Sequence, residues 1–332
     1  MAGAALKPDP ATRHAEHAVT RGFDVPVALF NFNRPQMTRR VFEIVRQIKP
    51  RKLLLVADGP RDTRPDDARL CAEVRAVFDG IDWECEVFRN FSDTNLGSFR
   101  RNSSGLNWVF ETVEEAIILE DDCVPALSFF PYCEELLERY RDDLRVGVIS
   151  GNNFGFPRAG NRQDSYYFSA YALTWGWASW RRVWQTVDLS MSWWQPESGI
   201  ELLRKTFARS AEWQHWYKIY SSIHDGGTRN AWDFQLMLSS YRNKQYCAIP
   251  KVNQVSNIGF GMESTHHTDE FSLLHDIQRY ELDFPLVHPA DVRPDQKVDH
   301  AIFRIRFKPS IPQRIRNKLI RIYRQARKQA GA

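Results

Sequence analysis

Three consecutive carboxylates, Glu120, Asp121 and Asp122, directly follow a short apolar run at 116–119. A run of this kind is typical of a buried strand, so the acids are expected where the strand leaves the sheet. Three carboxylates within about 10 Å of chain repel one another, and a cation would neutralise them. Oxygen ligands suit Mg²⁺ or Mn²⁺, which also hold substrate phosphates. The alternative is a solvated acidic turn, or a cap for the helix expected from Ser128.

The surrounding sequence predicts alternating strands and helices through the first 150 residues. Near-continuous apolar strands of this kind indicate a parallel sheet covered by helices on both faces. In such sheets ligands bind outside the carboxyl ends of the strands. We expect strands at 25–30, 52–57, 85–89, 116–119 and 146–150, and helices at 37–48, 66–78, 102–113 and 129–140.

Polar residues follow each of these strands, and several of them are arginines. The planar guanidinium of arginine pairs two phosphate oxygens at once, so arginines beside the acid triplet suit a metal–diphosphate ligand. Neither GxGxxG nor a P-loop is present, which disfavours a dinucleotide oxidoreductase and a P-loop kinase. The strand-end residues are Arg34, Asp58, Arg100 and Arg101 in the loop before 102, and Asn152 and Asn153, which could equally be turn formers.

The second half of the chain is rich in tryptophan and in expected loops. The chain has 11 Trp residues, and Trp175 and Trp177 lie in one Trp-Gly-Trp motif. A tryptophan can form a flat platform for a sugar, but most are expected in an aromatic core. Asp233 follows a tryptophan in a helical pattern, where an ion pair with Arg229 is the alternative to a chemical role and Asp225 is a nearby rival.

Charge and cysteine content bear on location. Five cysteines without paired spacing argue against a disulfide framework or a zinc site and for a reducing compartment. Residues 1–23 are polar and expected to be a disordered lead, and neither a secretory signal nor an apolar run of 18 residues is present. We expect a cytoplasmic protein.

Ten basic residues and no acidic residue lie between 304 and 328. The apolar residues in this segment have helical spacing, which suits an interfacial helix on an anionic membrane. The alternative is a helix that packs its apolar side on the protein. Nucleic-acid binding is disfavoured, because the basic residues are confined to this segment and no DNA- or RNA-binding motif accompanies them.

The motifs together resemble the GT-A nucleotide-sugar glycosyltransferases from about Val25 to Phe271, most closely the N-acetylglucosaminyltransferase I type and the bacterial hemolytic-protein-like glycosyltransferases. The resemblance implies a doubly wound, mostly parallel α/β domain. Its parts would be a nucleotide-sugar-binding half at 24–150 and an aromatic-rich acceptor half at 151–284. The basic helical tail at 285–332 lies outside the resemblance. The motifs are Asn-Arg, Asp-Gly, Glu-Asp-Asp before Ser-Phe-Phe, Ile-Ser-Gly-Asn-Asn, Trp-Gly-Trp, Trp-Asp, and Ser-Asn-Ile-Gly-Phe-Gly before a His.

The resemblance also implies roles for single residues. Asp122 and a late loop residue, His266, would hold a divalent metal, Mn²⁺ or Mg²⁺. Asp233 would be the catalytic base, and Asn152, Asn153, Trp175 or Trp177 would contact the acceptor or the sugar. The donor-binding residues would be Arg34 and Asp58 at the base and ribose, Arg101 or Arg100 near them, and Glu120 and Asp121 at the ribose and sugar.

The expected activity is transfer of a sugar, with inversion, from a nucleoside-diphosphate sugar to a glycan, a glycolipid or a surface polysaccharide intermediate. The tail could place the enzyme on the inner face of the membrane. Two other functions stay open. A sugar-1-phosphate nucleotidyltransferase has the same fold but needs a glycine-rich loop, which 31–35 lacks. A non-catalytic membrane- or surface-glycan-binding protein is the second.

Overall fold

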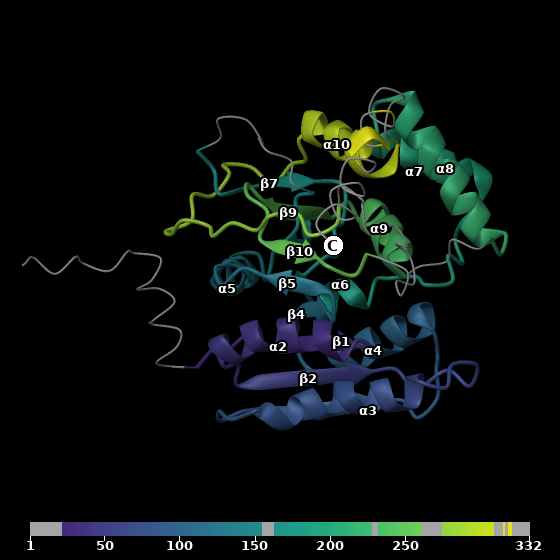
Figure 1. Ribbon diagram of the computed structural model, residues 1–332. Coiled ribbons are helices and arrows are strands. Elements are labelled where there is room, and N and C mark those ends of the chain that lie inside the picture. Colours follow the sequence, from purple (N-terminus) through teal and green to yellow (C-terminus); the bar gives the residue numbers. More distant parts are fainter. Residues whose placement is uncertain are drawn as a thin grey trace, which may run out of the picture.

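The computed structural model describes residues 22–154, 163–227, 232–260 and 274–308, together with 315 and 318–320. Within these ranges the chain forms one large sheet with helices on both faces and a small two-stranded sheet beside it (Figure 1). The strands of the large sheet are, in spatial order, β3 (Glu86–Phe91), β2 (Lys52–Ala57), β1 (Val27–Asn31), β4 (Glu115–Glu120), β8 (Trp177–Trp180), β6 (Val146–Ser150), β9 (Tyr246–Pro250) and β7 (Tyr166–Ser169).

The first half of the chain supplies a parallel set of strands. β1 lies between β2 and β4, and Val27 is in register with Leu53 on one side and Ile117 on the other. The carboxyl ends of these three strands therefore meet at one edge of the sheet, where ligands bind in α/β proteins. The helices of this half are α2 (Pro35–Ile48), α3 (Asp67–Val77), α4 (Ser98–Thr112) and α5 (Phe129–Arg139).

Both faces of the sheet are covered because the strands are apolar at successive positions. Val27 and Leu29 pack in one core with α2, α3 and α5, whereas Ala28 and Phe30 pack in a second core with α4. Alternate residues of a strand point to opposite faces, so strands that are apolar throughout are stable only between two layers of helices. The predicted layered α/β architecture is confirmed.

The second half adds antiparallel strands to the mostly parallel sheet that was predicted. β8 lies in the Trp-rich segment and is antiparallel to both of its neighbours, with Ala178 in register with Ile117 of β4 and Ile149 of β6. β9 is parallel to β6, and β7 is antiparallel to β9. The sheet is therefore mixed. The sequence did not predict β8, because Trp-Ala-Ser-Trp does not form an apolar run like those of the first half.

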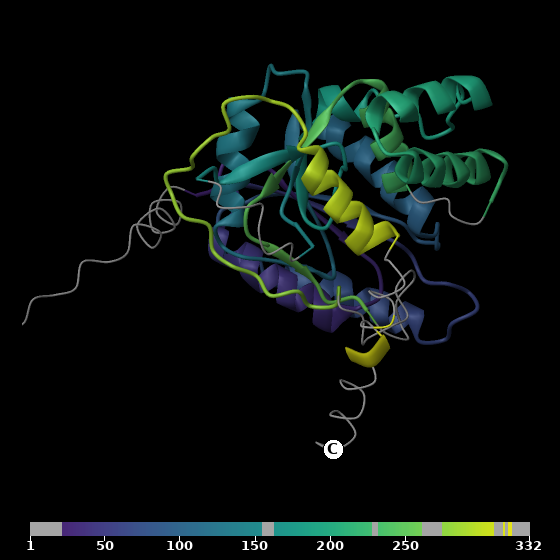
Figure 2. The ribbon, with the colours of Figure 1, turned by 90° about the horizontal axis from the view of Figure 1, so that it is seen from above.

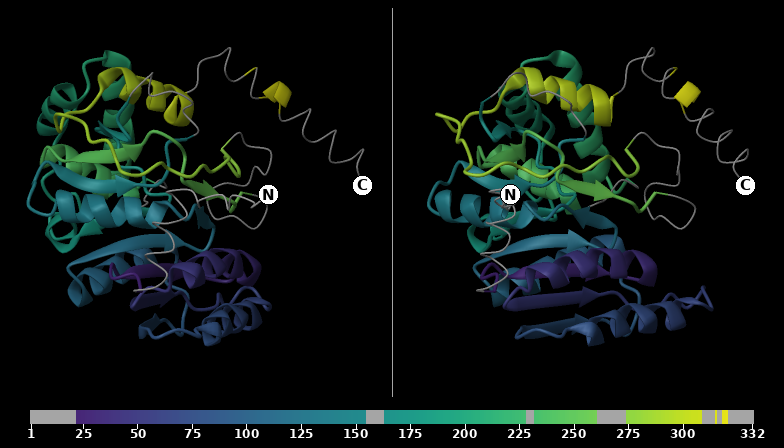
Figure 3. Two further views of the ribbon diagram at one scale, coloured as in Figure 1. Left: turned by 90° about the vertical axis from the view of Figure 1, so that its left-hand side faces the viewer. Right: turned by 60° about the vertical axis from the view of Figure 1, so that its left-hand side comes forward.

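The helices of the second half cover the same face of the sheet as α4. Seen from above, α10 lies in front of the sheet with α7 and α8 beside it (Figure 2). The purple and blue first half and the green and yellow second half occupy opposite ends of one sheet (Figure 3). These helices are α6 (Arg181–Trp184), α7 (Pro196–Thr206), α8 (Ser210–His224), α9 (Trp232–Arg242) and α10 (Gln296–Ile302).

The C-terminal segment begins inside this fold, although the sequence predicted a tail from residue 285. A π-helix, Phe303–Phe307, continues α10, and its first residue is buried in the core that contains α8 and α9. The Phe303 ring lies 5.2 Å from the ring of His215 on α8. Val298, Ile302 and Phe303 form an apolar stripe at helical spacing, and this stripe holds the segment on the domain.

A two-stranded antiparallel sheet lies at the carboxyl edge of the large sheet. β5 (Cys123–Pro125) directly follows the acid triplet and pairs with β10 (Val255–Asn257), with Asn257 in register with Cys123. This pairing brings the Ser-Asn-Ile-Gly motif beside the triplet, from which it is remote in the sequence.

The buried position of Phe303 generates a prediction. Phe303→Ala should lower the free energy of unfolding by about 3–5 kcal/mol, because it removes a buried ring and leaves a cavity. Urea denaturation followed by fluorescence measures this change. Leu319→Ala is the control: its side chain is 61% exposed, so we expect a change within about 0.5 kcal/mol. Equal stability of the two variants would show that residues beyond 295 do not pack on the domain.

Candidate functional site

The acid triplet lies at the carboxyl edge of the parallel strands, as predicted. Glu120 ends β4 beside Phe30 of β1, and the backbone N–H of Asp121 donates to the carbonyl of Phe30 at 2.9 Å. Asp121 and Asp122 are buried at the start of the connection to β5. Burial raises the pKa of Glu120 well above its ordinary value, and the charges of Asp122, Asp121 and Asp233 add to this shift. Burial likewise raises the pKa of Asp121, although Arg34 opposes it.

Arg34 is the cation that faces the triplet. It directly precedes α2, whose first residue is Pro35, where a proline is well tolerated. Its Nη1 lies 3.0 Å from Oδ2 of Asp122 and 3.4 Å from Oδ1 of Asp121. Burial by itself lowers the pKa of the guanidinium, but the three carboxylates raise it above its ordinary value. Arg34 therefore lies at the same sheet edge as the triplet, as its strand-end position predicted, and its donor-binding role stays a prediction.

Asp58 lies at the end of β2, but its carboxylate is already bonded to the chain. Oδ1 accepts the backbone N–H groups of Gly59 and Leu96 at 2.9 Å each. Oδ2 accepts the backbone N–H of Gly97 at 3.1 Å and the side-chain amide of Asn95 at 3.0 Å. These bonds hold the loop that leads into α4. Its donor-binding role stays a prediction.

Arg100 and Arg101 lie in the first turn of α4 and not in a loop as predicted. The helix begins at Ser98 because Gly97, at φ +77°, and the bonds to Asp58 turn the chain early. Arg101 is buried, and its Nη2 donates to the side-chain oxygen of Asn90 on β3 at 2.8 Å. Burial lowers the pKa of Arg101, against a smaller opposite effect of Asp58. Arg100 is exposed. Of the three arginines predicted to bind the donor, all of them in the described ranges, only Arg34 forms an ion pair with the triplet.

Asp233 comes from the second half of the chain and acts electrostatically on Glu120. It lies in the first turn of α9, and its Oδ1 accepts the backbone N–H of Phe234 at 3.1 Å. The ring of Trp232 before it stacks on Trp177 at 5.6 Å. The predicted catalytic residue and the predicted donor site therefore lie near each other, although Arg229, its possible partner, lies outside the described residues.

Arg306 is a further residue near Asp233, and the sequence predicted for it no place in the site. It lies on the π-helix, 5.8 Å from the rings of Trp175 and Phe154. Burial lowers the pKa of its guanidinium, and Asp233 acts in the opposite direction. The sequence signal was present in the apolar stripe before it, but this arginine was counted with the basic tail.

The two tryptophans predicted to contact sugar differ in position. Trp177 is 1% exposed, and its ring stacks on Trp232 of α9, so it is part of the core that packs beside Asp233. Trp175 is partly exposed and contacts Phe154 and Phe260 edge-on, with centroids 5.1 and 5.8 Å apart. Only Trp175 has exposed surface on which a sugar could stack.

Asn152 and Asn153 are both buried and bonded to the backbone. The amide of Asn152 accepts from the N–H of Phe154 at 2.9 Å, and that of Asn153 donates to the carbonyl of Lys251 at 3.2 Å. These contacts fix the chain after β6. A sugar contact of either residue stays a prediction.

Two residues were expected to hold a divalent cation. Asp122 is described in the structure, and His266 lies outside the described residues. In the described ranges, no three His, Cys, Asp or Glu side chains form a metal-binding group. Mg²⁺ in phosphate sites is commonly held by one or two carboxylates together with substrate phosphates and water. A Cβ added at Gly259 would lie 1.9 Å from Oδ2 of Asp122, so only a glycine leaves room for the carboxylate at this position. The residues fit a cation whose remaining ligands come from a substrate.

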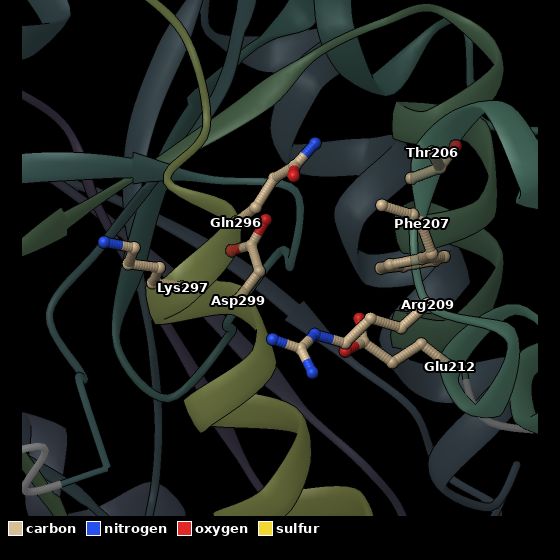
Figure 4. Close-up of a pocket in the computed structure, with 8 residues that line it drawn as sticks. Thr206, Phe207, Arg209, Glu212, Gln296, Lys297 and Asp299 are labelled. Atoms are coloured by element: carbon tan, nitrogen blue, oxygen red, sulfur yellow. The ribbon is translucent and has the colours of Figure 1, made fainter.

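A small pocket of about 120 Å³ lies elsewhere, between the α7–α8 junction and α10 (Figure 4). No residue that lines it was a predicted site residue. Glu212 and Asp299 face it from opposite sides, with Arg209 beside Glu212. Oδ1 of Asp299 accepts the hydroxyl of Ser169 at 2.5 Å, and burial raises the pKa of Asp299 to about 7.

This pKa predicts a pH-dependent contribution to stability. Between about pH 4 and pH 7 the folded protein keeps the proton on Asp299. In the same range the unfolded chain, with a carboxyl pKa near 3.8, has lost it. The contribution of Asp299 is therefore fully present below about pH 4 and disappears as the pH rises through about 7. Asp299→Asn should flatten the fall in unfolding free energy between pH 5 and 7 by up to about 1.4 kcal/mol per pH unit. An unchanged profile in urea titrations at several pH values would contradict this.

Comparisons with known proteins give little. No family model and no curated protein matches the chain. Among solved structures, the crystal structure of S. aureus TarS 1-349 is similar with a TM-score of 0.39 and 10% identity, over 69% of this chain and 58% of that chain. The chain therefore spans less than two thirds of that structure, and a likeness this low assigns no activity.

Each helix in the described ranges is too short or too polar to cross a bilayer.

Proposed function

We propose that this protein is a metal-dependent glycosyltransferase that moves a sugar from a nucleoside-diphosphate sugar to a glycan, a glycolipid or a surface polysaccharide intermediate. The observation that supports it most is the meeting of two groups from opposite halves of the chain. The Arg34–Asp121–Asp122 cluster lies at the carboxyl ends of β1 and β4, and Asp233 on α9 acts on Glu120. Donor and acceptor chemistry require such a convergence.

The donor half would bind the diphosphate through charge. The Arg34 guanidinium can exchange its carboxylate partners for phosphate oxygens, to which it offers two parallel N–H groups. Asp122, with His266, would hold a divalent metal, which supplies neutralisation of charge on the departing diphosphate. Glu120 and Asp121 would contact the ribose and sugar hydroxyls.

The acceptor half would supply the base. Asp233 would accept the proton of the acceptor hydroxyl as its oxygen attacks the anomeric carbon, while the bond from that carbon to the diphosphate breaks. Attack from the face opposite the diphosphate gives inversion. Arg306 would help to keep the Asp233 carboxylate ionised, because a nearby cation favours the charged form. Trp175 would contact the acceptor.

The metal assignment has a direct test. A screen of UDP-, GDP- and CDP-sugars by thermal shift would first identify a donor that binds the parent, because ligands of the native state raise Tm. With that donor, Mn²⁺ should raise the Tm of the parent further. Asp122→Ala should abolish this increase. Asp142→Ala, which removes an exposed acid, is the control and should behave as the parent. If Asp122→Ala binds the donor and Mn²⁺ like the parent, the metal is held elsewhere.

The base assignment is tested by Asp233→Asn. We expect slow, Mn²⁺-stimulated release of nucleoside diphosphate by the parent without acceptor, and a fall of about 10²–10⁴-fold in that rate in the variant, with donor binding retained. Asp225→Asn is matched, because Asp225 is the nearby rival and its side chain is 75% exposed. Loss of activity in Asp225→Asn alone would reverse the assignment. Absence of release by the parent with every donor would favour the non-catalytic alternative.

A further inference from the structure

The Ser-Asn-Ile-Gly motif after β10 surrounds the carboxylate of Asp122. Asn257 Nδ2 donates to Asp122 Oδ1 at 3.0 Å, and the backbone N–H of Ile258 donates to the Asp122 carbonyl at 2.9 Å. The thiol of Cys123 lies 3.5 Å from the same Oδ1. One oxygen of Asp122 thus faces neutral donors, while Oδ2 faces the positive charge of Arg34 at 3.0 Å.

The orientation of the Asn257 amide is fixed by its other contact. The backbone N–H of Gly259 donates to Asn257 Oδ1 at 2.9 Å. Because a backbone N–H can only donate, the oxygen of the amide must face Gly259 and the nitrogen must face Asp122. Asn257 is also buried, so it has little freedom to turn. The amide therefore acts as a rigid link between the β10 end and the carboxylate.

Gly259 completes the arrangement by leaving room. A Cβ at this position would lie 1.9 Å from Oδ2 and 2.6 Å from Cγ of Asp122. Contacts below 3.0 Å force one group to move, so any side chain here would push the carboxylate from its place. The need for glycine is steric: Gly259 is not among the glycines with positive φ.

We infer that Asn257 is a positioning residue that holds the Asp122 carboxylate with Oδ2 directed at bound positive charge, and that Gly259 keeps the space around that oxygen. The inference rests on the proposed function for the identity of that charge, the divalent metal. A neutral amide suits this task better than a lysine or arginine, because it fixes the carboxylate without competing for its negative charge. Hydrogen-bonded neighbours of metal ligands commonly have this role.

Metal affinity tests the inference without any turnover. Asn257→Ala should weaken Mn²⁺ binding about 10–100-fold, as measured by electron paramagnetic resonance of free Mn²⁺ in the presence of the donor selected by thermal shift. Gly259→Ala should weaken it in the same direction by displacing the carboxylate. Asn253→Ala is the matched control: Asn253 is a buried asparagine of the same segment whose amide donates to the carbonyl of Val255 at 3.0 Å and not to Asp122.

Each outcome decides one question. Parent-like Mn²⁺ affinity in a folded Asn257→Ala, or equal losses in Asn257→Ala and Asn253→Ala, would overturn the positioning role. If the parent binds no Mn²⁺, the metal in the proposed function is wrong, and the positioning role is then decided by the metal-free crystal structure of Asn257→Ala, or of Gly259→Ala if the former does not fold. In that structure the Asp122 carboxylate should be turned, and an unmoved carboxylate would overturn the inference.

Discussion

The burial of like charges at the end of β4 is the constraint on which the rest of the site depends. Glu120, Asp121 and Asp122 are adjacent, and leaving water raises the free energy of each ionised carboxylate. The fold offsets this cost in two ways. Arg34 provides a buried positive charge, and the pKa values of Glu120 and Asp121 rise. Both effects lower the negative charge at this strand end.

The second constraint is that the two halves must share one sheet. β8 lies between β4 and β6 and is antiparallel to both, so the chain of the second half returns across the edge where the acids lie. Trp177 on that strand stacks on Trp232 of α9, and Asp233 directly follows Trp232 in the chain. The aromatic core thus sets the place of the proposed base, and Arg306 reaches the same place from the C-terminal π-helix.

Several polar residues that sequence reasoning assigned to ligand binding are engaged in holding the chain. Asp58 accepts four hydrogen bonds that shape the loop before α4, and Asn152 and Asn153 bond the backbone after β6. These residues still lie at strand ends, where polar side chains satisfy the backbone groups that leave the sheet. A strand-end position therefore serves structure and binding alike, and contacts alone separate the two.

Local apolar runs, and the residues that end them, were enough to predict the layered α/β core and the parallel order of its first strands. They also placed the acid triplet and Arg34 at one edge of the sheet. The tertiary structure alone decided which distant groups meet. Asn257 and Gly259 reach Asp122 only through the pairing of β5 with β10, and Arg306 approaches Asp233 only because Phe303 is buried. Long-range pairing depends on packing between surfaces far apart in the chain. The apolar spacing of one segment shows that it packs on something, but not which distant surface it contacts.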